Sequence, residues 1–207
     1  MSTMTTDFTQ PASEAMLQTV AERLRERNFE TIIVATGADA KAAVMERIPD
    51  GVQVHSGKSK TLEDIRVFAE LMASDRYDFV RKRTSKMDRK TQAREIRKLG
   101  ASPDVMLGSV QALTEAGQLV VASASGSQIG PYASGAGALI LVVGSQKIVP
   151  DLDSALRRIT EHVQPYDDAR LREQIGIGTQ LTRILILERD FMAGRTTVVL
   201  VREPVGF

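Results

Sequence analysis

The residues that could do chemistry lie in four short segments, each at the end of a predicted strand or helix. In the first segment, His55–Thr61, Gly57 separates a strand from a helix. Backbone N–H groups at such a turn point toward an anion, and the helix dipole favours negative charge there. Ser59 or Thr61 is also suited to cap the helix. The segment therefore predicts either an anion-cradling loop or a simple capped turn.

The same segment ends like the phosphate-binding loop of nucleotide hydrolases. Gly57-Lys58-Ser59 matches the last part of that motif, which requires four residues between its two glycines. The preceding glycine, Gly51, is separated from Gly57 by the five residues 52–56, which form the predicted strand. A strand cannot wrap a phosphate, so the spacing argues against a nucleotide hydrolase.

The second segment, Leu113–Gln118, is predicted to end a short helix or turn and to open a strand. Two interpretations of it remain open. In one, Gly117 lets the chain turn at the helix end and Glu115 is solvated. In the other, Glu115 is catalytic at a strand edge, as a base, a nucleophile or a carboxylate that binds a hydroxyl group.

The last two segments each follow a predicted strand. Ser125 and Gly126 belong to a small-residue loop that either lets a ligand approach the backbone or is a flexible surface loop. Lys147 follows the apolar run 138–143 and is placed to meet an anion where open α/β sheets bind ligands. It is equally consistent with an exposed lysine beside Asp151, which we predict to be a helix cap.

Composition excludes several other kinds of site. The 207-residue chain has a net charge of +1, no cysteine and two histidines, His55 and His162. It therefore has no disulfide, thiol nucleophile or cysteine-held cluster, and we predict neither a metal site nor a cofactor. No apolar run reaches the roughly 18–20 residues of a membrane span, and the polar start lacks a secretory pattern. We expect a cytoplasmic protein that does not bind membranes.

Positive charge gathers in residues 76–100. This segment has ten Lys or Arg and three Asp or Glu, which gives it a charge of +7. It contains two aromatic residues, Tyr77 and Phe79, and no recognisable nucleic-acid-reading motif. We interpret it as an exposed, solvated helix and predict no nucleic-acid partner.

The order of the predicted elements indicates an α/β domain. Residues 1–11 are predicted to be a disordered leader, and residues 12–207 to form one domain with an open, mainly parallel sheet covered by helices. Apolar residues at helical spacing begin after Ser13. The last two strands, Arg183–Glu188 and Thr196–Arg202, flank a loop with Gly194 and are expected to form a C-terminal β-hairpin.

Taken together and in this order, these segments resemble the lactate-utilisation (LUD) domain family. The resemblance covers residues 15–207 and is most specific in its last two internal motifs. It is carried by Gly57-Lys58-Ser59-Lys60-Thr61-Leu62 (with one inserted residue), Thr114-Glu115-Ala116-Gly117-Gln118-Leu119, Ser125-Gly126-Ser127-Gln128, the run from Val142 to Leu156, and the closing Val205-Gly206-Phe207.

This resemblance implies a fold related to ribose-5-phosphate isomerase A, glucosamine-6-phosphate deaminase and coenzyme A transferases. It also implies a role in oxidising L-lactate to pyruvate together with Fe–S partner proteins. Some members carry a cysteine-rich stretch where this chain has Ile175–Gln180, which contains no cysteine. We therefore expect a non-redox accessory component. We also expect it to bind a small anion and to form a homo-oligomer. Whether it is itself an enzyme stays open.

The alternative function is an independent enzyme of the coenzyme A transferase or sugar-phosphate type that uses Glu115. For the ligand itself we predict one shared pocket at the carboxyl edge of the sheet, because parallel strands point the same way. Its predicted lining is Ser56, Gly57, Ser59, Thr61, Ser125, Gly126 and Lys147.

Overall fold

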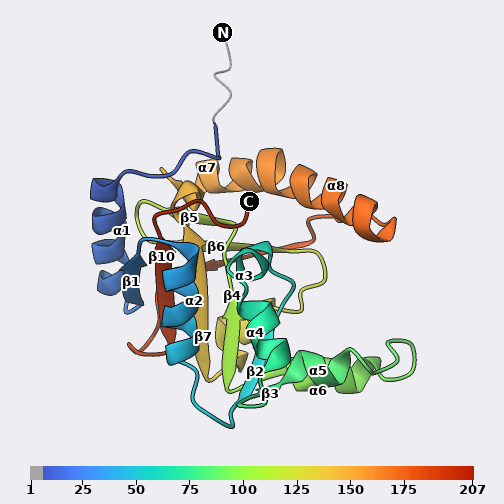
Figure 1. The fold of residues 1–207 in the computed structure, drawn as a ribbon. Helices are drawn as coiled ribbons and strands as arrows, with labels where there is room; N and C mark the ends of the chain where they lie inside the picture. The colour runs from blue at the N-terminus through green and yellow to red at the C-terminus, as the bar shows by residue number, and fades with distance from the viewer. Residues whose placement is uncertain (1–6) are drawn as a thin grey trace.

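Two β-sheets of different kinds organise the computed structural model, which describes residues 7–207 (Figure 1). The larger sheet has six parallel strands in the order β1-β10-β7-β4-β2-β3. Its strands are β1 (Glu30–Val34), β2 (Gln53–Ser56), β3 (Asp78–Phe79), β4 (Val105–Gly108), β7 (Ala138–Gly144) and β10 (Thr196–Val201).

The smaller sheet has four strands in the order β8-β5-β6-β9. Strand β5 pairs with β8 in parallel and with β6 antiparallel, and β6 pairs antiparallel with β9. The strands are β5 (Ala112–Thr114), β6 (Leu119–Ser123), β8 (Ile148–Val149) and β9 (Arg183–Leu187). The architecture is thus an α/β domain with an open parallel sheet, as the sequence predicts, and with a second, mixed sheet beside it.

The layers follow from which residues are apolar on each face. On one face of the parallel sheet, helices α2, α3 and α4 bury Val44, Leu62 and Leu71 against Val142 and Val199. On the other face, helix α1 and the smaller sheet share a second core with the parallel sheet. The helices are α1 (Glu14–Glu26), α2 (Gly37–Glu46), α3 (Lys60–Asp64), α4 (Val67–Ala73), α5 (Val80–Thr84), α6 (Ala93–Ala101), α7 (Leu152–Arg157) and α8 (Gln164–Ile175).

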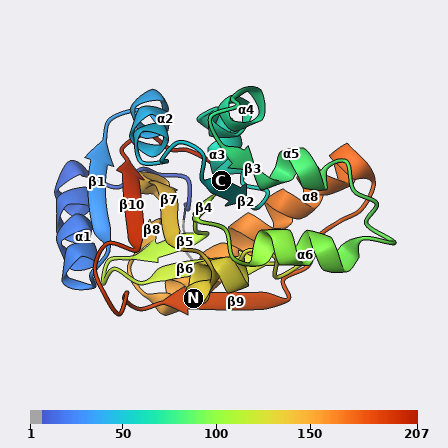
Figure 2. The same ribbon diagram turned by 90° about the horizontal axis from the view of Figure 1, so that it is seen from below.

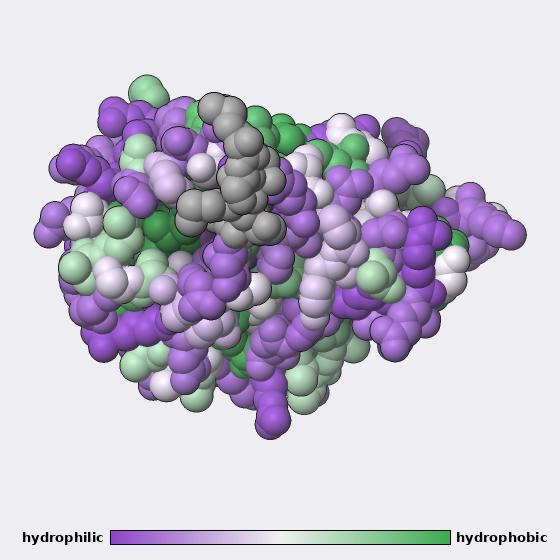
Figure 3. Space-filling view, turned by 90° about the horizontal axis from the view of Figure 1, so that it is seen from above, coloured by the Kyte–Doolittle hydropathy of each residue, from purple (hydrophilic) through white to green (hydrophobic). Residues whose placement is uncertain are grey.

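The outer face of the smaller sheet is covered by one long helical segment. Helix α7 continues through the π-helical turn η3 (Arg158–Val163) into α8, which extends across the top of the molecule in Figure 1. Ala155 and Ile159 pack against Ala112, Val120 and Val149. Seen from this side, the surface is mainly hydrophilic (Figure 3).

Local capping explains where several helices begin. The Ser13 hydroxyl accepts a hydrogen bond from the Met16 N–H at the start of α1, and the Asp151 carboxylate accepts one from Ser154 at the start of α7. The helix predicted after Ser13 and the helix cap predicted at Asp151 are confirmed. The Ser59 hydroxyl caps α3 by accepting from the Leu62 N–H.

The predicted C-terminal hairpin is wrong. Strands β9 and β10 lie in different sheets, where β9 pairs with β6, and β10 inserts between β1 and β7. Every residue of Thr196–Val201 is buried, as expected for a central strand covered on both faces. The gain from burying this strand in the parallel sheet outweighs a local pairing across the Gly194 loop.

The short helix expected before Gly117 is wrong, whereas the turn at Gly117 is confirmed. This region contains β5, and residues 114–117 form the turn that joins β5 to β6, with Gly117 at a φ of +87°. Glu115 therefore lies in a turn between two strands of the smaller sheet.

Residues 80–101 form a projecting arm made of α5, α6 and the loop between them (Figure 2). Helix α6 has no buried residue. At the base of the arm, Arg81 lies over the Phe68 ring at 4.9 Å and points toward the Ser56 carbonyl. The exposed helix predicted for the basic segment is present.

The predicted leader falls only partly within the described residues. Residues 1–6 lie outside them, whereas Phe8 is buried beside the smaller sheet. Within residues 7–207, the helices are all too short or too polar to cross a bilayer.

Candidate functional site

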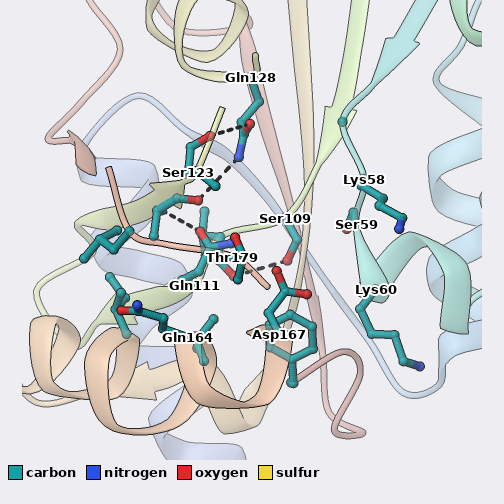
Figure 4. Close-up of a pocket in the computed structure, with 18 of the residues that line it drawn as sticks. Lys58, Ser59, Lys60, Ser109, Gln111, Ser123, Gln128, Gln164, Asp167 and Thr179 are labelled. Carbon is teal, nitrogen blue, oxygen red and sulfur yellow. Dashed lines mark hydrogen bonds between the residues drawn. The ribbon is translucent and has the colours of Figure 1, made fainter. Parts of the chain in front are cut away.

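The candidate site is a cavity of about 270 Å³ where the parallel sheet, the smaller sheet and α8 meet. Its walls come from the loop after β2, the ends of β4 and β6, the turn after β7, and the chain from η3 to residue 181. In Figure 4, the lysines of the Gly57 loop lie on one side, and Gln111, Ser123, Gln128 and Gln164 lie on the other.

Lys147 is the central charged group of the cavity. It sits in the 3-10 turn after β7 and is only 3% exposed, although it lines the cavity. Its ammonium donates to Thr61 Oγ1 at 2.8 Å, Ser109 Oγ at 2.9 Å and the Val110 carbonyl at 3.3 Å. None of these partners is a carboxylate. The interpretation of Lys147 as an exposed lysine is wrong, because the chain after β7 turns inward under the C-terminal residues.

Burial without an acidic partner changes the acidity of this lysine. Desolvation, followed by the positive charge of Arg158, lowers the pKa of Lys147 to about 7, and Asp64 opposes the shift. The group is therefore both an ammonium and a free amine near neutral pH.

A second buried cation lies close enough to influence Lys147. Arg158 in η3 is fully buried and donates to the Gln111 carbonyl through Nη1. Its Nε and Nη2 atoms have no hydrogen-bond partner in the described part of the chain. Burial lowers the pKa of Arg158 to about 10. Two buried cations in one region without acidic partners make the interior here strongly attractive to an anion.

A tyrosine fixes the end of β4 next to the cavity. The Tyr132 hydroxyl accepts from the Ser109 N–H at 3.2 Å and donates to the Ser109 carbonyl at 3.4 Å. A side chain at Gly108 would place its Cβ 1.5 Å from this hydroxyl, so only glycine allows the approach. The Ser109 side chain is thereby held toward Lys147.

The last residues of the chain close the cavity over Lys147. Gln146 donates to the Val205 carbonyl at 3.0 Å, and the Gly206 N–H donates to Asp64 at 3.1 Å. Gly206 has a φ of +76°, and a Cβ there would lie 2.3 Å from Thr61 Oγ1 and 3.1 Å from Lys147 Nζ. The conformation and the space at residue 206 both require glycine.

Helix α8 contributes an ion pair to the same cavity. Arg170 bonds Asp167 at 2.6 Å and approaches Glu63 of α3 at 3.9 Å, and its side chain is 14% exposed. Phe207 also lines the cavity and packs on Tyr166 of α8, with ring centroids 4.9 Å apart. The Arg170 charge is already balanced by Asp167, in contrast to the charge of Lys147.

The structure brings together most, but not all, of the residues predicted to bind a ligand. Those that line the cavity are Gly57, Ser59, Thr61, Ser125 and Lys147. Ser56 is buried in β2, and Gly126 belongs to the loop after β6, where it has a φ of +76° and faces Arg183; neither lines the cavity. The role of all seven in binding stays a prediction.

The predicted ligand residues do not all lie at the carboxyl edge of one sheet. Ser125 and Gly126 follow β6, which belongs to the smaller sheet, so they are not at the carboxyl edge of the parallel sheet. Ser125 reaches the cavity because the smaller sheet packs against the larger one. Gly57 has no positive φ, and a Cβ there would meet Gln128 at an ordinary 3.8 Å. A side chain at residue 57 is therefore compatible with this backbone.

Glu115 is separate from these residues. It lies in the β5–β6 turn, where its N–H donates to the Val149 carbonyl, and it does not line the cavity. The geometry thus gives no support to the enzymatic alternative that uses Glu115.

Several cavity residues were not predicted from the sequence. Ser109 directly follows a strand, a position that could have identified it, because ligands bind at such strand ends. Asp167 and Arg170 had no comparable signal, since only the return of α8 over the sheets brings them to the cavity. In residues 7–207, no group of three or more metal-ligating side chains is present.

Comparison with known proteins identifies the family of this chain. The family model of the LUD domain matches residues 17–201. The chain belongs to the LUD domain family. As a member, it is one of a group of proteins associated with lactate utilisation. The motifs around Gly57 and Lys147 lie within the matched part of this LUD domain and line the cavity.

A solved structure shows the same fold. The crystal structure of a DUF162 family protein from Deinococcus radiodurans, at 1.70 Å resolution, superposes with a TM-score of 0.50. The two chains share 14% sequence identity over 92% of this chain and 99% of the other. No curated protein sequence matches this LUD-domain chain.

Proposed function

We propose that this LUD-domain protein is a non-redox component of lactate utilisation whose cavity binds a small organic anion. L-Lactate, pyruvate or a phosphorylated relative belongs to the expected ligand class. The catalytic oxidation of lactate is assigned to Fe–S-containing partner proteins, because this chain has no cysteine to hold a cluster. We expect the protein to work in the cytoplasm.

One observation carries the binding proposal. Lys147 is only 3% exposed and lines the cavity, and its ammonium donates only to neutral oxygen atoms. A buried charge without a counter-ion costs free energy that an arriving anion recovers. The nearby buried Arg158 adds to the same positive potential.

The opposite wall indicates what the rest of the ligand looks like. Gln111, Gln128 and Ser123 line this wall. The Ser123 hydroxyl donates to Gln128 Oε1, and Gln111 Oε1 accepts from the Ala122 N–H, so the Gln111 amide nitrogen is the group best placed to donate to a hydroxyl or carbonyl oxygen. The ligand therefore has one anionic end and one neutral polar end. A 2-hydroxy or 2-oxo carboxylate has both features.

Titration calorimetry at pH 6.5 tests the binding proposal with L-lactate, pyruvate and inorganic phosphate as separate ligands. Lys147→Met removes the charge and preserves most of the side-chain volume. We expect it to weaken binding roughly 10- to 100-fold, since a hydrogen bond to a charged group contributes about 1.5–3 kcal/mol. Lys90→Met removes the same charge from the exposed arm and is the matched control.

The result is decided by the difference between these variants. Binding that is lost in Lys147→Met and kept in Lys90→Met supports the proposal. Equal affinities in both variants and the wild type, or no binding of any of the three anions, contradict it.

The accessory role needs a separate experiment in lactate-grown cells. Affinity purification of the full chain is expected to recover an Fe–S protein, identified by mass spectrometry and by its iron content. Recovery of none, together with normal growth of a deletion strain on L-lactate, would remove the accessory role and leave the binding proposal untouched.

A further inference from the structure

We propose that Ser109 is a nucleophile for acyl groups, with Lys147 as its base, and that esters or thioesters of small carboxylic acids are the substrate class. The identity of the acyl group rests on the proposed function, because the carboxylate released would be the anion that the cavity binds. The Ser109–Lys147 pair itself rests on the contact between the two side chains and on the burial of Lys147.

The two side chains are close enough for a proton to pass between them. Ser109 Oγ accepts from Lys147 Nζ at 2.9 Å, within the reach expected of a nucleophile and its base, and its own hydroxyl donates to the Val110 carbonyl at 3.3 Å. For the reaction, the Ser109 hydroxyl must turn from this carbonyl to the neutral Lys147 amine. Serine–lysine pairs of this type replace the serine–histidine pair on several folds. Ser109 lines the cavity directly after β4, so its hydroxyl faces the space that a substrate would occupy.

The choice of Ser109 over its neighbour follows from exposure. Thr61 Oγ1 also bonds Lys147, at 2.8 Å, but the residue is only 2% exposed. Thr61 donates to Ser109 Oγ at 3.2 Å. Ser109 is partly exposed and is therefore the hydroxyl that an acyl carbon can reach, whereas Thr61 positions the pair.

Lys147 is suited to accept a proton because its charged form is disfavoured. The charged groups that act on it are Arg158, which lowers its pKa, and Asp64, which raises it. The net effect of burial and these charges is a pKa of about 7, so a substantial fraction of the lysine is a free amine at pH 7–8. No cysteine or histidine in the cavity lining competes for this role.

The reaction consists of two acyl transfers, first to Ser109 and then to water, and Lys147 accepts and returns a proton in each. Ser109 Oγ forms a bond to the acyl carbon while its proton passes to the neutral Lys147 amine. The bond from the acyl carbon to the alcohol or thiol then breaks, and the leaving group takes that proton from Lys147. Water repeats the sequence on the acyl-serine, which releases the carboxylate and restores the Ser109 hydroxyl.

Labelling with a fluorophosphonate probe tests the proposal, because such probes phosphonylate an activated serine and release fluoride. We expect peptide mapping to place the label on Ser109 and the labelling rate to rise with pH through about 7, the pKa of Lys147. Ser109→Ala should abolish labelling. Lys147→Met should lower the rate by roughly 100-fold or more, as for loss of a general base.

Two controls separate chemistry from folding. Ser85→Ala removes an exposed hydroxyl on the arm and is expected to label like the wild type. The pH profile of the wild type needs no variant, so it tests Lys147 as the base even if Lys147→Met is poorly folded. Hydrolysis of p-nitrophenyl acetate, followed by mapping of the acetyl group, provides a second readout.

The outcomes also distinguish this inference from the proposed function. Labelling of Ser109 that depends on Lys147 and follows the pH profile supports the pair. No label on Ser109, or a rate that is unchanged in Lys147→Met and flat with pH, overturns it. Anion binding that persists in Ser109→Ala while labelling is absent from the wild type would end the nucleophile and keep the anion site.

Discussion

The cations of this protein fall into two groups with opposite surroundings. Lys147 and Arg158 are buried beside the cavity, and neither bonds a carboxylate in residues 7–207. On the arm formed by residues 80–101, Arg94, Arg97 and Lys98 are exposed to water. An exposed charge costs almost nothing because water solvates it, whereas a buried unpaired charge must be offset elsewhere. The arm holds far more positive charge, yet the buried Lys147 and Arg158 are the better indication of an anion-binding function.

The two regions also differ in how tightly they are packed. Near Lys147, two glycines are required by direct contacts with Tyr132 and Thr61. Helix α6 of the arm, by contrast, buries no side chain. Substitutions of similar chemistry should therefore have large effects at the cavity and small ones on the arm.

The largest expected effect comes from Gly108→Ala. The added methyl group would lie 1.5 Å from the Tyr132 hydroxyl, so the tyrosine must move and lose its bonds to Ser109. We expect the free energy of unfolding in urea to fall by roughly 3 kcal/mol. Gly130→Ala is the control, since a methyl group there meets nothing within 4 Å. Equal losses in both variants would contradict the tight packing around Ser109.

A smaller effect is expected in the dependence of stability on pH. The pKa of an unperturbed lysine is 10.5 and that of Lys147 in the fold is about 7, so between these values the unfolded chain binds more protons than the folded one. The free energy of unfolding therefore rises with pH above 7, by roughly 1–3 kcal/mol up to pH 9 relative to Lys147→Met. Lys90→Met should follow the wild type. Parallel curves for the wild type and Lys147→Met would show that Lys147 is not a buried cation.

The smallest effect is expected on the arm. Replacing Arg94 and Arg97 with glutamine should change the free energy of unfolding by less than about 0.5 kcal/mol, the usual range for exposed sites. The affinity for the anion at physiological salt should stay within about twofold of the wild-type value, because salt screens exposed charges and no arm residue lines the cavity. We also expect no retardation of duplex DNA by the wild type at low salt. A large loss of affinity in the arm variant would mean that the arm belongs to the binding site.

Much of the fold can be predicted from local patterns. Short β-branched runs such as Ile32–Val34 and apolar residues at helical spacing identify the strands and helices of the parallel sheet. The smaller sheet could not be predicted in this way, because β9 pairs with β6 across about 60 residues of intervening chain. The unbroken run of β-branched and apolar residues over Thr196–Val201 is the sequence signal of a central strand rather than half of a hairpin.

The site was harder to predict than the fold. The segments around Gly57, Ser125 and Lys147 have suitable residue types, and the structure brings them to one cavity. Burial of Lys147 depends on the C-terminal turn at Gly206 folding back over it, which no local pattern reveals. The contact between Ser109 and Lys147 likewise joins the ends of two strands, β4 and β7, that only the sheet order makes neighbours.

Lys147 is a buried cation whose charge a bound anion would balance, and the titration of its amine tests this most directly. Lysine labelled with carbon-13 at Cε reports each amine by its NMR shift as pH changes. We predict one lysine with a pKa of about 7 that is missing in Lys147→Met and whose pKa rises when pyruvate or phosphate is added. If every lysine titrates near 10.5, or if the Lys147 pKa does not move with either anion, the account is contradicted.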